Sequence, residues 1–409
     1  MTAPSGEVNK PGAPKILFVV PSFPKEINPW VRAHIEGMLR HGWQVVVAAK
    51  QIDRDGLPAF QAKYPQVQTF DITVESDRLF ASTGWRRKLQ LTKAFGLRYR
   101  RLFPSGNVKR MQMRAGAVME IAKRFRPHVM HAHFGDAGLV AAPVARRLGI
   151  PLSISFHGTD LLDHEVLKYN PYKATTTAAT SVVYSSFMQR VARERLDGRI
   201  VRLSFGVQPE LFCPQTPRAD WSNPVNITFV ARLIYYKGQE TAIRAMVELA
   251  KRETTRKFRL TLVGDGPDRE KLQSLVLDLE APVCFAGMVS QPEVASYVHA
   301  SDLCLVCSLV ADDGWEETFS YSALEAMACG KPVIATDTGA LSETVGGGGA
   351  IVAPGDYVAL ADEIERMVQA GSPASWAELA RKRAEDFSLE RMQAEHAALA
   401  NELRASARN

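Results

Sequence analysis

Two glutamates, Glu317 and Glu325, stand eight residues apart at the start of an expected helix that follows an apolar stretch. With a rise of about 1.5 Å per helical residue, up to ~12 Å separates them along the helix axis. Hydrolases that work with a pair of carboxylates hold the two groups roughly 5–9.5 Å apart. The spacing therefore disfavours such a hydrolase and suits one extended ligand that is held at both ends.

The residues between these glutamates favour a phosphate in the middle of that ligand. Four of them fall at the N-terminus of the expected helix: Thr318, Phe319, Ser320 and Tyr321. Free backbone amides and the positive end of the helix dipole attract anions there. A nucleotide-sugar fits this arrangement, with its sugar hydroxyls on Glu317, its diphosphate at the amides and its ribose hydroxyls on Glu325.

The elements that must position these residues alternate between strands and helices along two blocks of the chain. The strands expected in the first block are 16–20, 44–49, 129–132, 152–156 and 182–184, and those in the second are 225–231, 260–263, 283–286, 303–307, 332–335 and 350–352. Such alternation predicts parallel sheets covered by helices on both faces. We therefore expect an α/β chain of two Rossmann-like, doubly wound domains that face a cleft. They would comprise residues 1–212 and 225–388, with a proline-containing linker at 213–224.

Composition excludes several classes of protein. The 409 residues carry 50 Lys and Arg against 44 Asp and Glu, and the net charge of +6 is too small to indicate a nucleic-acid partner. Residues 1–14 lack the apolar region of a signal peptide, and no apolar run approaches the ~20 residues of a membrane span. Five cysteines do not make a disulfide framework and indicate a reducing compartment, so we expect a cytoplasmic protein.

One segment is far more basic than the rest. Residues 81–126 contain 13 Lys or Arg and a single acidic residue, and apolar and aromatic side chains are interleaved with the charges within 85–114. A basic amphipathic helix is typical of a segment that lies on an anionic membrane. A helical insertion that packs on its own domain explains the pattern equally well. RNA binding has no motif to support it.

The stretch 317–325 resembles the E-x7-E motif of the retaining glycosyltransferases of group 1, also called family 4, whose fold is termed GT-B. Residues 231–238, Ala-Arg-Leu-Ile-Tyr-Tyr-Lys-Gly, are similar to the G-R-L-x-x-x-K-G loop of the same family, and the resemblance covers nearly the whole chain. It implies that Arg232 and Lys237 grip the donor diphosphate, where their charges stabilise the leaving group.

Two further turns of the second block resemble donor contacts of this family. The sequence Val-Gly-Asp-Gly-Pro resembles a turn that brings the backbone of Gly264 and Gly266 close to the nucleotide. The following Ala-Gly-Met-Val turn resembles one whose backbone, here at Met288 and Val289, contacts the base. The glycine turn lacks the third glycine of a dinucleotide fingerprint, which argues against a dehydrogenase.

In the first block, the sequence Ser-Phe-His-Gly-Thr-Asp resembles a turn that faces the cleft in the family. The resemblance implies that His157 bonds a sugar hydroxyl or the diphosphate and that Asp160 lies on the acceptor side. His131 and His133 fall two residues apart, on one face of a strand end. A metal site would need a third ligand that the sequence does not reveal, and the resemblance instead places His133 on the acceptor side.

The first expected strand is followed by Pro-Ser-Phe-Pro-Lys-Glu-Ile-Asn rather than by the Gly-Gly loop of many relatives. This stretch is similar to a variant found in bacterial exopolysaccharide glycosyltransferases of the colanic-acid and amylovoran type. It makes Lys25, Glu26 and Asn28 candidate acceptor contacts. The helix expected at 389–409 would pack back on the first domain, as in relatives.

The resemblance implies a retaining, metal-independent hexosyltransferase of bacterial exopolysaccharide synthesis. Its catalytic residues would be Arg232, Lys237, Glu317 and His157, and its donor a UDP-sugar or a GDP-sugar, with no metal or other cofactor. The acceptor would be a saccharide on a polyprenyl diphosphate, at the inner face of the plasma membrane where segment 85–114 docks. Three alternatives stay open: a soluble small-molecule acceptor, a nucleotide-sugar 2-epimerase, and a non-catalytic GT-B scaffold. Thr318, in place of the family's usual Gly, leaves room for the last.

Overall fold

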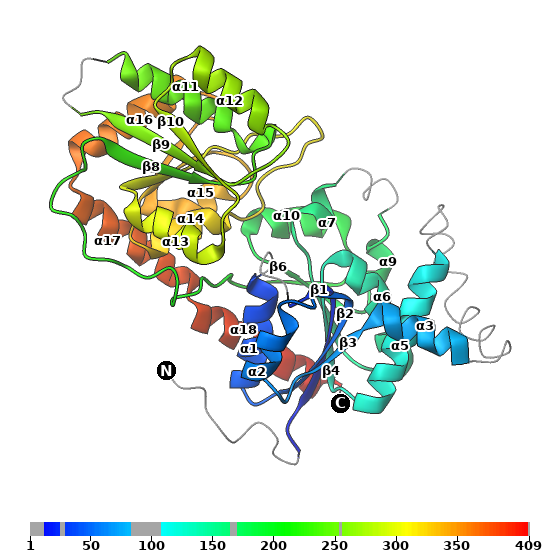
Figure 1. The fold of residues 1–409 in the computed structure, drawn as a ribbon. Helices are drawn as coiled ribbons and strands as arrows, with labels where there is room; N and C mark the ends of the chain where they lie inside the picture. Colours follow the sequence, from blue (N-terminus) through cyan, green and yellow to red (C-terminus); the bar gives the residue numbers. More distant parts are fainter. Residues whose placement is uncertain (1–11, 25–28, 83–107, 164–169, 253–255, 408–409) are drawn as a thin grey trace. The chain divides into compact units, whose positions relative to one another are not determined.

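The computed structural model of this chain describes residues 12–24, 29–82, 108–163, 170–252 and 256–407. The chain divides into two compact units (Figure 1). The first unit holds Met1–Tyr184, Met188–Leu203 and Glu390–Asn409, and the second holds Ser185–Phe187 and Ser204–Leu389. The expected linker 213–224 lies in the second unit, where Trp221 is buried. Within the described ranges, no helix has the length and apolarity to cross a bilayer.

The first unit is built on a seven-stranded, wholly parallel sheet. Its strands are β1 (Lys15–Phe23), β2 (Gln44–Ile52), β3 (Gln68–Asp71), β4 (Val129–His133), β5 (Leu152–Ser155), β6 (Thr180–Val183) and β7 (Arg199–Arg202). They lie in the order β3-β2-β1-β4-β5-β6-β7. The two edge strands, β3 and β7, were not expected from the sequence because they are short and carry polar residues, whereas central strands read as apolar runs.

Helices connect these strands. They are α1 (Pro29–Arg40), α2 (Leu57–Lys63), α3 (Ile72–Ser82), α5 (Val108–Phe125), α6 (Gly135–Leu148), α7 (Gly158–Leu162), α9 (Lys173–Thr176), α10 (Ser186–Arg195) and the C-terminal α18 (Leu389–Ser406). Residues 16–20 of β1 are no more than 1% exposed, because helices cover a central parallel strand on both faces. Helix α18 packs on α1, where the Gln393 amide donates to the Ala33 carbonyl at 3.0 Å.

The second unit is built on a six-stranded parallel sheet in the order β10-β9-β8-β11-β12-β13. Its strands are β8 (Val225–Val230), β9 (Phe258–Val263), β10 (Val283–Gly287), β11 (Leu303–Val306), β12 (Val333–Thr336) and β13 (Gly349–Val352). All six were expected from the sequence, within a few residues at each end. The buried core joins strand residues such as Phe229 and Leu305 to helix residues such as Ile243 and Ile364.

The helices of this unit begin and end at recognisable signals. They are η1 (Tyr235–Lys237), α11 (Gln239–Ala250), α12 (Arg269–Asp278), α13 (Gln291–Ala300), α14 (Tyr321–Ala328), α15 (Leu341–Val345), η2 (Gly346–Gly348), α16 (Tyr357–Ala370), α17 (Pro373–Ala384) and η3 (Glu385–Phe387). Ser290 and Glu293 form a capping box that starts α13, and Ser320 caps α14 by accepting from the Ala323 amide.

The strand order of each sheet reverses once along the chain. In the first sheet the chain runs outward from β1 to β3 and returns to β4 on the other side of β1; in the second, it does the same around β8 and β11. In open parallel sheets, ligands bind beyond the carboxyl ends of the strands at such a switch point. The candidate ligand-binding residues are therefore those that follow β8 and β11 and those that follow β4 and β5.

Candidate active site

The switch point of the second sheet brings Lys237 and Glu317 together. The Lys237 ammonium lies 2.5 Å from Glu317 Oε2, and the Ser308 hydroxyl donates to the same oxygen at 2.9 Å. Lys237 follows β8 through the short helix η1, while Ser308 and Glu317 lie in the loop after β11. Glu317 is only 6% exposed, so the carboxylate is held in one position by two donors. Sequence analysis predicted that both residues belong to the site, but it revealed neither their contact nor the hydrogen bond from Ser308.

Aromatic rings frame this ion pair. The Lys237 ammonium lies 4.7 Å from the centre of the Trp315 ring, and Tyr236 packs against Trp315 with ring centres 4.6 Å apart. A cation over an aromatic face is stabilised by the ring quadrupole. The Arg232 guanidinium, which is exposed, donates to the Tyr236 hydroxyl at 2.5 Å. Both predicted phosphate-binding cations therefore contact one aromatic pair. Sequence analysis missed that pair, because Tyr236 occupies a variable position of the motif at 231–238 and Trp315 lies before the E-x7-E stretch.

The predicted glycine turn packs against the loop that carries Arg232. Gly264 has a φ of +135°, and a Cβ there would lie 2.0 Å from the Ala231 carbonyl oxygen. A Cβ on Gly266 would lie 2.3 Å from the Leu233 carbonyl oxygen. Only glycine lets the two backbones approach this closely. The glycines therefore let the two loops pack tightly against each other. Their approach to a nucleotide stays a prediction.

The residues at the start of α14 are anchored within the second unit. Phe319 packs on Phe205 with ring centres 4.3 Å apart, and the Tyr321 hydroxyl donates to the Gly206 carbonyl at 2.8 Å. Gly339 donates its amide to Glu316, and the next amide, that of residue 340, donates to the Glu317 carbonyl at 2.7 Å. The backbone from Glu316 to Tyr321, which includes Thr318, is therefore fixed at several points ahead of the Ser320 cap.

Glu325 lies one turn further along α14 and is 5% exposed. Burial raises the pKa of this carboxyl to about 8, and a hydrogen bond with Gln291 opposes the shift. Gln291 is the first residue of α13 and follows the turn of Met288 and Val289, where the Met288 side chain is exposed. The residue that bonds the predicted ribose contact, Gln291, therefore lies two residues after the predicted base contact at Val289.

In the first unit, Asp160 holds the loop of His157. Its two carboxylate oxygens accept the His157 amide at 2.8 Å and the Gly135 amide at 3.0 Å. Burial raises the Asp160 pKa to about 7, against the effect of these two bonds. The acceptor contact of Asp160 stays a prediction. Within the first unit, its two oxygens tie the end of β5 to the start of α6.

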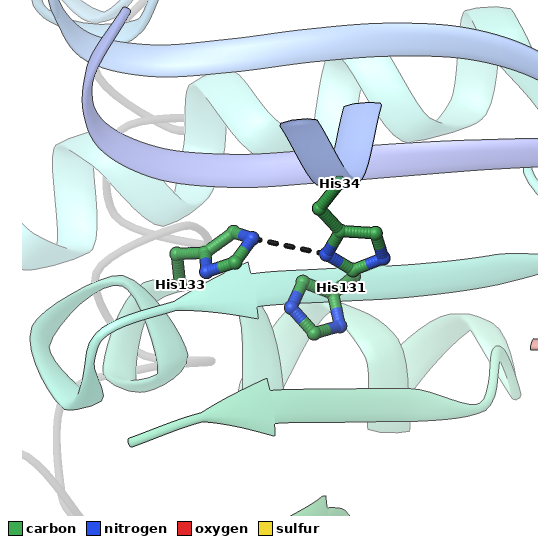
Figure 2. A group of neighbouring side chains, drawn as sticks. All are labelled: His34, His131 and His133. Carbon is green, nitrogen blue, oxygen red and sulfur yellow. Dashed lines mark hydrogen bonds between the residues drawn. The ribbon is translucent and has the colours of Figure 1, made fainter. Parts of the chain in front are cut away.

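His157 lies next to His133. The His157 Nε2 is 3.4 Å from His133 Nδ1. The other nitrogen of His133 is 3.1 Å from His34 Nδ1, a contact that Figure 2 shows. Burial lowers the pKa of His157 to about 3 and holds that of His133 well below its usual range, and the neighbouring imidazoles add to both shifts. His34 comes from α1, 99 residues before His133, so no local pattern in the sequence links them.

Some predicted residues lie outside the described part of the chain. Lys25, Glu26 and Asn28 belong to the undescribed stretch 25–28, and the basic segment 85–114 is described only from residue 108 onward, where α5 begins. Their predicted roles at the acceptor and at a membrane stay predictions.

Two family descriptions match the chain. Residues 27–205 match the "Glycosyl transferase 4-like domain", and residues 224–370 match "Glycosyl transferases group 1". With the two switch-point sheets and the E-x7-E site, these matches define the class: the chain belongs to the group 1 (family 4) glycosyltransferases and has the GT-B fold.

Individual relatives agree with this assignment. A protein of Escherichia coli named for colanic acid biosynthesis, glycosyltransferase WcaL, is 27% identical over 361 residues, which cover 81% of this chain and 84% of that protein. The amylovoran biosynthesis glycosyltransferase AmsK of Erwinia amylovora is 28% identical over 261 residues, 60% of this chain and 63% of its own. The structure of Anabaena Alr3699/HepE in complex with UDP superimposes with a TM-score of 0.71 at 19% identity, over 96% of this chain and 100% of that one.

Proposed function

We propose that this protein is a retaining glycosyltransferase that moves a hexose-type sugar from a UDP-sugar to a saccharide acceptor in bacterial surface polysaccharide synthesis. The observation that carries the proposal is the contact of Lys237 and Ser308 with Glu317 at the switch point of the second sheet. The likeness to WcaL and AmsK supports a polysaccharide product. The Alr3699/HepE structures with UDP and with UDP-glucose support a UDP-sugar donor.

The proposed reaction needs positive charge at the leaving group. The anomeric C–O bond to the diphosphate breaks, the acceptor oxygen bonds to the anomeric carbon, and the acceptor proton passes to the leaving phosphate oxygen. Lys237 and Arg232 would stabilise the departing UDP in place of a divalent metal. Glu317 and Trp315 already hold Lys237, so little reorganisation accompanies the reaction. Glu317 would also accept hydroxyls of the transferred sugar.

The proposed acceptor is carried on a polyprenyl diphosphate. Segment 85–114 would dock the protein on an anionic membrane through its Lys and Arg side chains. Co-sedimentation with phosphatidylglycerol vesicles, compared with neutral phosphatidylcholine vesicles, tests this part. Failure to co-sediment with the phosphatidylglycerol vesicles would favour a soluble small-molecule acceptor.

A donor screen by calorimetry tests the nucleotide-sugar site. UDP-, GDP-, ADP- and dTDP-sugars are titrated into the wild type and into the variants Arg232→Ala and Glu325→Ala, with Arg366→Ala as the matched control. Arg366 pairs with Glu363 on α16, away from the strand ends of the site. We expect one donor to bind the wild type and the control alike and both site variants to lose it. Equal binding by all four proteins, or binding by none, would favour the scaffold alternative.

Turnover separates the remaining alternatives. A nucleotide-sugar 2-epimerase would consume the donor without an acceptor, whereas a glycosyltransferase needs one for transfer. The anomeric configuration of the product, read by NMR, then decides whether the reaction is retaining.

A further inference from the structure

Three histidines from two elements meet inside the first unit and take no direct part in the donor site. His131 and His133 alternate along β4 and so lie on one face of the strand, and His34 reaches them from α1 (Figure 2). All three side chains are buried, at 1–2% exposure. We propose that His34, His131 and His133 bind one transition-metal ion, with Zn²⁺ the ion that best suits three imidazoles.

The distances suit a common ion. One ring nitrogen from each histidine lies within 4.8 Å of the other two, and the His34 and His133 nitrogens are 3.1 Å apart. Two nitrogens bound to a tetrahedral zinc at about 2.0–2.1 Å stand about 3.3 Å from each other. The closest pair therefore needs almost no movement, and the widest separation must shorten by about 1.5 Å.

The surroundings of His131 resemble the outer shell of a metal site. One ring nitrogen lies 2.8 Å from the Ser153 hydroxyl and the other 3.1 Å from the Ser155 hydroxyl, which in turn bonds the Tyr184 hydroxyl at 2.6 Å. Metal-binding histidines use their second nitrogen in such a hydrogen bond, and it fixes the ring orientation. One ring nitrogen of His131 can exchange its hydrogen bond for a bond to the ion, while the other nitrogen keeps its serine hydroxyl.

The chemistry of the donor set selects the ion. Each of the three histidines offers a metal one imidazole nitrogen, and all three side chains are buried. Imidazole nitrogens suit zinc, copper and nickel, whereas Mg²⁺ and Ca²⁺ prefer oxygen ligands. Three protein ligands leave the fourth position of a tetrahedral zinc for an oxygen ligand. His396 of α18 packs against the His34 ring with ring centres 3.7 Å apart and covers one side of the group.

Such an ion would have a consequence for the unit. It would link α1 to β4 and fix the ring of His133, whose other nitrogen faces His157. By fixing the His133 ring, the metal would also fix the position of the His157 ring that contacts it. This consequence depends on the proposed function, but the metal site itself does not.

The test is direct measurement of metal binding on the full chain without a polyhistidine tag. The protein is treated with a chelator and dialysed, and Zn²⁺ is then titrated by calorimetry and counted by elemental analysis. His34→Gln and His131→Gln remove one ligand each. His41→Gln is the matched control, because His41 is exposed just after α1 and its ring bonds only the Gly37 carbonyl among the contacts described. Co²⁺ replaces Zn²⁺ in a parallel sample, where visible absorption reports tetrahedral nitrogen coordination.

We expect the wild type and His41→Gln to bind one equivalent of Zn²⁺ and to melt at a higher temperature with it. Both ligand variants should lose this equivalent, although their circular dichroism stays native. The proposal is overturned if the wild type takes up no equivalent, or if all four proteins bind Zn²⁺ alike. Should the ligand variants not fold, the wild-type cobalt spectrum decides, because the absence of a tetrahedral band contradicts the site.

Discussion

Replacing Glu325 by Gln should stabilise the second unit at neutral pH while weakening donor binding. The carboxyl is 5% exposed on α14, and burial raises its pKa from the usual 4.5 to about 8. The folded protein therefore keeps a proton that the unfolded chain releases above pH 4.5. Folding is favoured fully below that pH and less as the pH rises toward 8, where the effect levels off.

The size of the effect follows from this interval. Each pH unit between the two pKa values changes the free energy of unfolding by about 1.4 kcal/mol. Between pH 4.5 and pH 7, ionisation of the buried carboxyl therefore lowers the free energy of unfolding by about 3 kcal/mol. Glu325→Gln restores this free energy because an amide does not ionise. Urea unfolding at pH 4.5 and at pH 7 measures the difference, with hydrogen exchange in β11 and β12 to follow the second unit separately.

The control is Glu270→Gln, which changes a solvent-exposed glutamate of α12 in the same unit. We expect it to shift stability by no more than about 0.5 kcal/mol at either pH. Equal stability of wild type and Glu325→Gln at pH 7, or a parallel loss at both pH values, would refute the reasoning from burial.

Three further results are expected. The affinity of the wild type for UDP should rise from pH 6 to pH 8 as Glu325 ionises, by up to about tenfold per unit. Glu325→Gln should lack this rise, and the ratio of the two affinities removes the titration of UDP itself. Lys237→Met should lower the turnover of the identified donor by a factor of about 10²–10³ in a UDP-release assay. A change below tenfold would mean that a residue other than Lys237 stabilises the leaving diphosphate. Gly264→Ala should destabilise the second unit well beyond Gly355→Ala in thermal unfolding, because both have positive φ but only the Cβ of the first meets a backbone oxygen, at 2.0 Å. Equal losses would mean that backbone strain alone matters.

Much of the fold could be predicted from the sequence, since buried parallel strands are apolar runs that a pattern reveals. The edge strands β3 and β7 could not, because an edge is partly solvated and tolerates polar residues. Lys237 and Glu317 were placed in one site by resemblance, but their mutual contact could not be foreseen. It depends on the register of two loops that lie 80 residues apart.

The histidine group shows the same limit more sharply. His131 and His133 were visible as a pair because they are two residues apart on one strand. His34 and His396 carry no local signal, and only the packing of α1 and α18 brings them in. Sequence spacing identifies ligands within one element, whereas ligands from separate elements need the fold.

Helix α18 also affects the order in which the two units can complete their folding during translation. From Glu390 onward the helix belongs to the first unit, and the second unit ends just before that residue, at Leu389. It seats Gln393 so closely on α1 that a Cβ on Gly37 would lie 2.5 Å from the Gln393 side chain. As the ribosome proceeds from the N-terminus, the second unit is synthesised in full before the first can gain this helix. The first unit therefore begins to be synthesised first and is completed last. Until α18 is made, α1 and its His34 lack the contacts with that helix.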